Sequence, residues 1–260
     1  MLGSIAGDII GSPYEFASFK EREFPLFVKD STFTDDTILT VAVADALLHN
    51  LDVAQTIKSY AQRYPHASYG GSFHKWMVSK SMEPYNSWGN GSAMRTSPVG
   101  FLCQDERSVL QTAKKCAEVT HNHSEGIKGA QAVSFAIYLA RHGSSKEEIK
   151  EQTTRWFGYD LSSCLDEIRP SYRFDESCQR TVPQAFLAFL ESSNYESAIR
   201  NAISLGGDAD TLACITGGLA EAYYGELPDH IVTEARRRLP EEFLRIVDDF
   251  YAVLDKENSR

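Results

Sequence analysis

Two short acidic stretches contain the residues best suited to chemistry. One is Gly206-Gly207-Asp208-Ala209-Asp210-Thr211, which precedes the apolar run 212–224. Adjacent glycines predict a backbone turn that closely approaches another group. Asp208, Asp210 and Thr211 then offer oxygen donors on the first turn of a predicted helix, a set suited to Mg²⁺, Mn²⁺ or Ca²⁺. Helix capping alone is the alternative, because Asp is favoured at this position with or without a metal.

The second stretch, Phe-Thr-Asp-Asp-Thr at 33–37, repeats this arrangement at the start of another apolar helix, predicted over 33–48. Thr34 is a natural N-cap, and Asp35 and Asp36 complement the helix dipole. Capping again accounts for each residue on its own. Two such helix starts facing each other would form a metal site.

A third carboxylate could reach the same cleft. The segment 2–14 reads as a helix, and its glycines at 3, 7 and 11 line one face, which predicts tight packing against a neighbouring helix. Pro13 ends or kinks this helix, so Glu15 follows on a turn. Glu15 is either an acid that points into a cleft or an ordinary surface residue.

The stretch 87–95, Ser-Trp-Gly-Asn-Gly-Ser-Ala-Met-Arg, resembles a phosphate-binding loop in type. Gly89 and Gly91 leave backbone amides free to approach a ligand, and a helix beginning near Ser92 would add its positive end, so a diphosphate is the natural guest. A plain turn explains the glycines equally. Trp88 could stack on a base or ribose, or simply lie at the rim.

Two histidines lie between predicted helices. The spacing of His121 and His123 would suit zinc, but no third soft ligand is near in sequence. A hydrogen bond from one histidine to a ligand or a carbonyl is the simpler interpretation.

The elements that position these residues are helices throughout. No alternating runs typical of strands are present, so we predict an all-α fold, a single compact domain over residues 1–260. The segments 65–94 and 164–178 show the least regular pattern. From caps and periodicity, further helices are predicted over 52–64, 105–120, 124–142, 145–157, 182–190, 195–205, 209–224, 228–239 and 241–256.

The composition and charge of the chain argue against several classes of protein. The chain has 260 residues, 42% of them hydrophobic, and a formal charge of −10, which argues against a nonspecific nucleic-acid or anionic-membrane surface. Its five cysteines form no C-x-x-C pair, as in reduced cytosolic proteins. From the sequence we expect neither a signal peptide nor a segment that spans a bilayer. We expect a soluble cytoplasmic protein.

Other acidic motifs do not fit the residues. An EF-hand loop beginning at Asp208 would need Glu where Leu219 stands. A D-D-x-x-D prenyl-diphosphate motif would need Asp at Leu39, and a D-x-D-x-T motif would need Thr at Leu212. All three are excluded.

Together, the segments 7–16, 33–37, 89–95, 120–121, 182–183 and 205–211 resemble, in order and over nearly the whole chain, the ADP-ribosylglycohydrolase family. The resemblance implies an all-α fold with two Mg²⁺ or Mn²⁺ ions between the two acidic helix starts. It also implies roles for individual residues. The metal ligands would be Thr34, Asp35, Asp36, Asp208, Asp210 and Thr211; the diphosphate loop would contain Ser87, Trp88, Gly89, Asn90, Gly91 and Ser92; and His121 would contact ribose.

The implied chemistry is hydrolysis of the bond between the distal ribose of ADP-ribose and an acceptor, with Glu15 or Asp36 as general base. The acceptor would be an ADP-ribosylated protein, ADP-ribose would be a product, and neither a membrane nor nucleic acid is expected as a partner. Two alternatives stay open. One is a non-catalytic ADP-ribose-binding or structural family member, and the other is a hydrolase of an ADP-ribosylated small molecule or nucleic acid.

Overall fold

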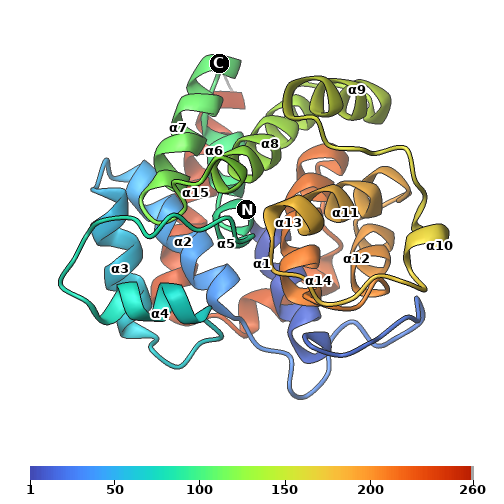
Figure 1. Ribbon diagram of the computed structural model, residues 1–260, viewed down its shortest axis with the longest axis horizontal. Coiled ribbons are helices and arrows are strands. Elements are labelled where there is room, and N and C mark those ends of the chain that lie inside the picture. The colour runs from blue at the N-terminus through green and yellow to red at the C-terminus, as the bar shows by residue number, and fades with distance from the viewer. Residues whose placement is uncertain (259–260) are drawn as a thin grey trace.

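Figure 1 shows the computed structural model, which describes residues 1–258 and the side chains of residues 1–256. In that part of the chain every regular element is a helix, and the one β pairing is an isolated bridge between Gly89 and Ser177. The all-α prediction is confirmed, while the last two residues of the expected 1–260 domain lie outside the described residues. In chain order the helices are α1 (Leu2–Gly11), the 3-10 helix η1 (Ser12–Tyr14), α2 (Asp35–Leu48), α3 (Val53–Arg63), α4 (Gly71–Val78), α5 (Gly91–Met94), α6 (Ser97–Leu102), α7 (Glu106–Glu118), α8 (Ser124–Arg141), α9 (Lys146–Phe157), α10 (Leu165–Ile168), α11 (Cys178–Leu190), α12 (Tyr195–Ile203), α13 (Ala209–Tyr224), α14 (Asp229–Arg237) and α15 (Glu241–Asn258).

Helix boundaries follow the caps that the sequence contains. Asp52 accepts a hydrogen bond from Gln55 at the start of α3, and Asp105 accepts one from Ser108 at the start of α7. Gly158 ends α9 in the left-handed conformation, with φ of 67°, which glycine adopts without strain. Most predicted ends therefore agree with the structure to within one or two residues.

Three short helices and one boundary differ from the prediction. The elements α4, α6 and α10 were not expected, because runs of four to eight residues carry too little periodicity to detect. The helix predicted to begin at Val182 begins one turn earlier, at Cys178, and continues through Pro183. Pro183 is the sixth residue of α11 and has no amide proton, so the intrahelical hydrogen bond from this position is not made.

The centre of the molecule is the pair formed by α1 and α13. Every residue of α1 is buried, and α13 is buried from Ala209 to Ala222. The close packing that the glycine spacing predicted is confirmed, and the neighbouring helix is α13: a Cβ on Gly11 would lie 2.6 Å from the Cα of Asp210, and one on Gly7 would overlap the carbonyl of Ala213. The two backbones therefore meet at a distance that side chains would prevent.

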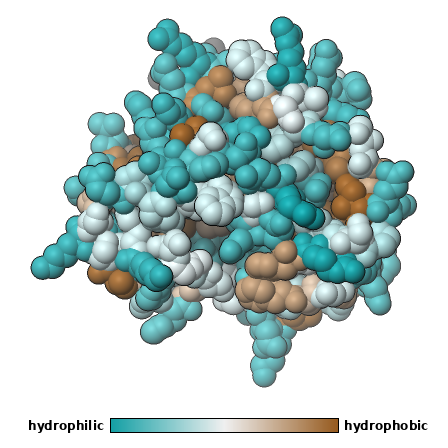
Figure 2. Space-filling model, in the orientation of Figure 1, coloured by the Kyte–Doolittle hydropathy of each residue, from teal (hydrophilic) through white to brown (hydrophobic). Residues whose placement is uncertain are grey.

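The other helices surround this pair. Helices α11 and α12 pack on α13 on one side, and α2 packs on α3 on the other, an arrangement that Figure 1 shows around α1. The face in Figure 2 is largely hydrophilic, with small separate hydrophobic patches. Among the described residues, no helix combines the length and the apolar character needed to cross a bilayer.

Candidate metal and ligand site

The start of α2 is held in place by a buried carboxylate on α1. Thr34 caps the helix by accepting from the amide of Asp36, at 3.2 Å. Asp8 in turn accepts four hydrogen bonds, from the amide and the hydroxyl of both Thr34 and Thr37. A carboxylate has about four lone-pair sites, so Asp8 is saturated. Its contacts fix the position of Asp36 rather than leaving an oxygen free for a ligand.

The start of α13 is built differently. Gly206 and Gly207 have φ of +70° and +79°, a region that side chains disfavour. The turn is pinned to the segment after η1, because Gly207 donates to the carbonyl of Ala17 and accepts from the amide of Phe16. Asp208 occupies the N-cap position but makes no side-chain capping hydrogen bond. Instead it accepts from Asn90 Nδ2 at 2.7 Å, so capping does not explain this carboxylate.

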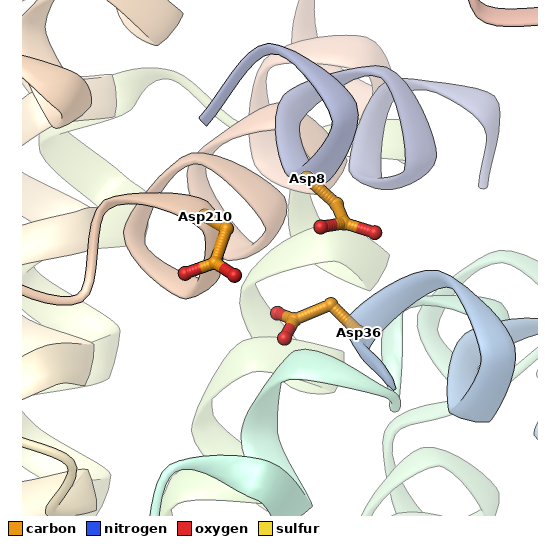
Figure 3. A group of neighbouring side chains, drawn as sticks. All are labelled: Asp8, Asp36 and Asp210. Carbon is orange, nitrogen blue, oxygen red and sulfur yellow. The ribbon is translucent and has the colours of Figure 1, made fainter. Parts of the chain in front are cut away.

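These two helix starts converge, as Figure 3 shows for Asp36 of α2 and Asp210 of α13, with Asp8 of α1 beside them. In each of two groups, one oxygen per carboxylate lies within 4.8 Å of the others. The groups share Asp210. One contains Asp8, Asp36 and Asp210, and the other contains Glu15, Asp208 and Asp210.

The donor set fits hard divalent cations. Asp36 Oδ1 is fully enclosed and has no hydrogen-bond partner among the described residues, although its Oδ2 accepts from the Thr211 hydroxyl at 3.2 Å. Burying an unpaired carboxylate oxygen is costly. Carboxylate and hydroxyl oxygens are the ligands that Mg²⁺ and Mn²⁺ prefer. A cation between the helix starts would supply the missing partner for Asp36.

Burial and mutual repulsion raise the pKa values of the carboxyl groups in the cluster. Burial raises the pKa of Asp36 and Asp210 well above the ordinary carboxyl range, and neighbouring carboxylates raise both further. Burial, followed by repulsion from Asp208, raises the pKa of Glu15 to about 7. Burial, with repulsion from Asp8 next, raises the pKa of Asp35 to about 8. The cluster strongly favours any species that brings positive charge.

The acidic cluster forms the floor of a cavity of about 450 Å³, within the range of small-molecule sites. Thr34 does not line this cavity, because its hydroxyl is engaged with Asp8 and the Asp36 amide. Ser92 is also absent from the lining, since its buried hydroxyl donates to the carbonyl of Gly126. The remaining predicted site residues all line the cavity: Glu15, Asp35, Asp36, Ser87, Trp88, Gly89, Asn90, Gly91, His121, Asp208, Asp210 and Thr211.

The glycine loop lines the same cavity beside the acidic floor, since Asn90 is hydrogen-bonded to Asp208. Its amides are partly used by the protein: Gly89 donates to Ser87 Oγ at 3.1 Å, and Asn90 donates to the carbonyl of Glu176 at 2.7 Å. This differs from the expectation of free amides, and it holds the loop rigidly against the segment before α11. Trp88 is 53% exposed, at the rim of the cavity.

The two histidines have different surroundings. His121 is buried, lines the cavity, and has its Nδ1 2.8 Å from the hydroxyl of Thr120. His123 caps α8, where its Nδ1 accepts from the amide of Glu125. Neither histidine belongs to a group of potential metal ligands among the described residues, which leaves the zinc interpretation without geometric support.

Sequence reasoning missed two features of the site. Asp8 was left without a role, although a carboxylate inside a glycine-striped apolar helix signals a buried partner elsewhere. Phe174 lies in a segment with no clear pattern, yet its ring stacks on that of Phe16 at the cavity wall, with centroids 5.0 Å apart. No signal in the sequence connects those two rings.

Comparisons with known proteins agree with this geometry. A chicken (Gallus gallus) protein, ADP-ribosylhydrolase ARH3, is 29% identical over 259 residues, which cover 75% of this chain and 71% of that protein. ADP-ribosylarginine hydrolase Tri1 of Pseudomonas putida strain GB-1 is 27% identical over 269 residues, covering 86% and 69%. A solved structure described as an ADP-ribosylglycohydrolase-related protein complex has a TM-score of 0.70 at 22% identity over 96% of each chain, which shows a common fold.

The family comparison extends over the entire chain. A family model described as ADP-ribosylglycohydrolase matches residues 1–260. The match includes both acidic helix starts, the glycine loop and His121, the segments that surround the cavity. The chain therefore belongs to the ADP-ribosylglycohydrolase family.

Proposed function

We propose that this protein hydrolyses the glycosidic bond between ADP-ribose and its acceptor, using two divalent cations, Mg²⁺ or Mn²⁺. The observation that carries the proposal is the position of Asp210 on the floor of the cavity, where it belongs to both carboxylate groups and has Asp36 as a possible co-ligand in one and Asp208 in the other. Two overlapping groups suit two neighbouring ions better than one. Family membership, and the names of relatives that act as ADP-ribosyl hydrolases, support the reaction class.

The ligand set proposed for the cations follows from which oxygens are free. Asp36, Asp208, Asp210 and Thr211 present oxygens to the space between the helix starts, and Asp35 lines the same cavity. Thr34 stays in the proposed ligand set because its hydroxyl oxygen has a second lone pair. The structure gives this hydroxyl two protein partners, Asp8 and the Asp36 amide. When bound, the cations would supply positive charge that orients the sugar hydroxyls and acidifies a water molecule.

The side chains of the chain perform the remaining steps. The glycine loop and His121 line the same cavity as the carboxylates and would hold the diphosphate and ribose of the substrate, which would place the anomeric carbon near the carboxylates. Glu15 or Asp36 would accept the proton of the attacking water as the bond to the acceptor breaks. The acidic floor would also stabilise positive charge that develops on the sugar ring in an oxocarbenium-like transition state.

We propose a protein as the acceptor. Tri1 is named as a hydrolase of ADP-ribosylarginine, so arginine-linked ADP-ribose is the first linkage to test, followed by serine-linked ADP-ribose. The exposed ring of Trp88 at the rim and the Phe16–Phe174 pair on the wall would contact the acceptor side chain or the nucleotide.

The test is release of ADP-ribose from arginine- and serine-modified proteins by the purified chain. Release is expected with Mg²⁺ or Mn²⁺ and loss of release with EDTA. A variant with Asp105→Asn, a surface helix cap, serves as the control for protein quality. No metal-dependent release from any linkage in a panel that also includes an ADP-ribosylated small molecule and nucleic acid would refute the proposal.

A further inference from the structure

A buried arginine lies beside the cavity without a carboxylate partner. Arg95 is fully buried, and its Nη2 donates to the carbonyl of Cys116 and to the hydroxyl of Thr120, both at 2.8 Å. A guanidinium can only donate hydrogen bonds. The oxygen of Thr120 must therefore act as the acceptor in this contact, and its own proton stays available for another partner.

That partner is His121. Thr120 Oγ1 lies 2.8 Å from His121 Nδ1, and the imidazole nitrogen can either donate or accept there. The charge of Arg95 decides between the two directions, because a nitrogen lone pair facing the cation is favourable and an N–H facing it is not. The hydroxyl thus donates to Nδ1, and Nδ1 carries no proton.

The other ring nitrogen faces the glycine loop. A Cβ placed on Gly91 would lie 3.3 Å from His121 Nε2, and one on Gly89 would lie 3.5 Å from it. The missing side chains leave space in front of Nε2, which has no hydrogen-bond partner among the described residues. Burial, and then Arg95, lower the pKa of His121 well below the usual histidine range, so the ring is neutral and carries one proton.

We propose that Arg95 and Thr120 are positioning residues that fix His121 in the Nε2–H tautomer, so that it donates a hydrogen bond to an oxygen of the ligand held against the glycine loop. The identity of that ligand as ADP-ribose rests on the proposed function; the tautomer does not. The order of hydrogen bonds, from Arg95 to Thr120 to His121, points the final donor into the cavity. A histidine with the opposite tautomer would present a lone pair, which repels an oxygen that carries no proton, such as a phosphate oxygen, and can only accept from a hydroxyl.

Tyr85 is the competing partner. Its ring lies 5.9 Å from the ring of His121, and its hydroxyl interacts with Thr120. If the Thr120 hydroxyl donated to Tyr85 instead, Nδ1 of His121 would be protonated. Tyr85→Phe removes this possibility and is expected to leave the tautomer unchanged.

The direct test is two-bond ¹H–¹⁵N correlation NMR of the ¹⁵N-labelled full chain at neutral pH, with His121→Gln used to assign the signals. The expected pattern has an unprotonated Nδ1 and a protonated Nε2 in the free protein. A protonated Nδ1, or a doubly protonated ring, would overturn the inference. Because the free protein is measured, this outcome does not depend on whether ADP-ribose is a ligand.

Matched variants test the positioning role. Thr120→Val should shift His121 toward the Nδ1–H form and raise the Kd for ADP-ribose about 3- to 10-fold, the loss of one hydrogen bond. Thr120→Ser retains the hydroxyl and should restore both readouts. A Val variant with the wild-type tautomer would overturn the assignment to Thr120. Failure of wild-type protein to bind ADP-ribose would instead overturn the ligand and the proposed function.

Discussion

The two acidic helix starts have similar sequences but are held in different ways. At α2 the backbone and hydroxyls of Thr34 and Thr37 converge on Asp8, which makes four hydrogen bonds. At α13 a glycine turn sets the backbone, and the Asp208 side chain accepts a hydrogen bond from Asn90. The first start is fixed by interior polar contacts and the second by backbone conformation. Loss of a contact at α2 should therefore cost stability, whereas loss at α13 should cost metal affinity.

The largest expected effect is at the carboxylate that both groups share. Asp210→Asn should reduce ADP-ribose release in Mg²⁺ to the level seen with EDTA, because both ion positions lose a ligand. It should also abolish the rise in melting temperature that saturating Mg²⁺ or Mn²⁺ gives the wild type by binding the native state. Release assays and thermal melts beside the Asp105→Asn control check this. A variant with undiminished metal-induced stabilisation would show that Asp210 does not link the two helix starts.

Glu15 belongs to neither helix start and should separate chemistry from metal binding. Glu15→Gln preserves size but removes basicity, so we expect kcat to fall by about 10²–10⁴-fold with two metals still bound. Asp36→Asn should lose metal affinity as well. Single-turnover rates and metal stoichiometry on both variants measure the contrast. A Glu15→Gln enzyme as fast as wild type, beside an inactive Asp36→Asn enzyme that retains two metals, would make Asp36 the base.

Among substitutions that disturb the start of α2, the substitution of Asp8 should reduce stability most. Asp8→Asn replaces an acceptor-only group by one that carries an NH₂, which faces the donors of Thr34 or Thr37. We expect a loss of about 2–3 kcal/mol in the free energy of unfolding, the cost of leaving buried donors unpaired. Urea denaturation measures it in EDTA. Asp52→Asn is the matched control, since Asn caps a helix as well as Asp; equal losses in both variants would contradict the comparison.

Replacing Asn90 should have the opposite effect to replacing Asp8: it should weaken metal binding and change stability little. Asn90→Ala removes the side-chain contact to Asp208, and partners of metal ligands typically contribute about 10–100-fold to affinity. We expect weaker Mg²⁺ binding by calorimetry with little change in stability. Thr181→Val removes the other side-chain hydrogen bond of Asn90, at 3.0 Å, and serves as the control. Unchanged affinity in the Ala variant would mean that the glycine turn alone positions Asp208.

The smallest expected effect is a dependence of stability on pH. Burial raises the pKa of Asp8, Glu15 and Asp35 to about 6, 7 and 8. In EDTA the folded protein thus keeps protons that the unfolded chain releases near pH 4, so this stabilisation is present below pH ~4 and is lost as pH rises through 6–8. Melting temperatures from pH 5 to 8 should fall, and less so with Mg²⁺. A flat profile in EDTA would indicate that the cluster is better hydrated than its burial suggests.

The sequence allowed much of the fold to be predicted because helix ends are local. Asp52, Asp105 and Gly158 act through residues three or four positions away, and their helices were placed correctly. The glycine stripe of α1 predicted close packing, but nothing in its spacing identified α13 as the partner. Long-range contacts depend on the packing of the whole chain.

The site was predictable in its residue types and less so in its contacts. The residues expected around the cavity lie there, apart from Thr34 and Ser92, whose hydroxyls turn toward protein acceptors. The role of Asp8 depends on two threonines more than twenty residues away, so no local pattern could reveal it. The metal ligand and catalytic assignments remain proposals that the variants above test.

The glycine stripe of α1 affects how closely the spacing between the two acidic clusters is fixed. Asp8 contacts the start of α2, and Gly11, three residues later on the same helix, contacts the backbone of Asp210. One turn of α1 thus sets the distance between the start of α2 and the start of α13, which are far apart in sequence. Backbone hydrogen bonds fix the length of a helix turn, so the spacing between the acidic clusters should change little when other parts of the molecule move.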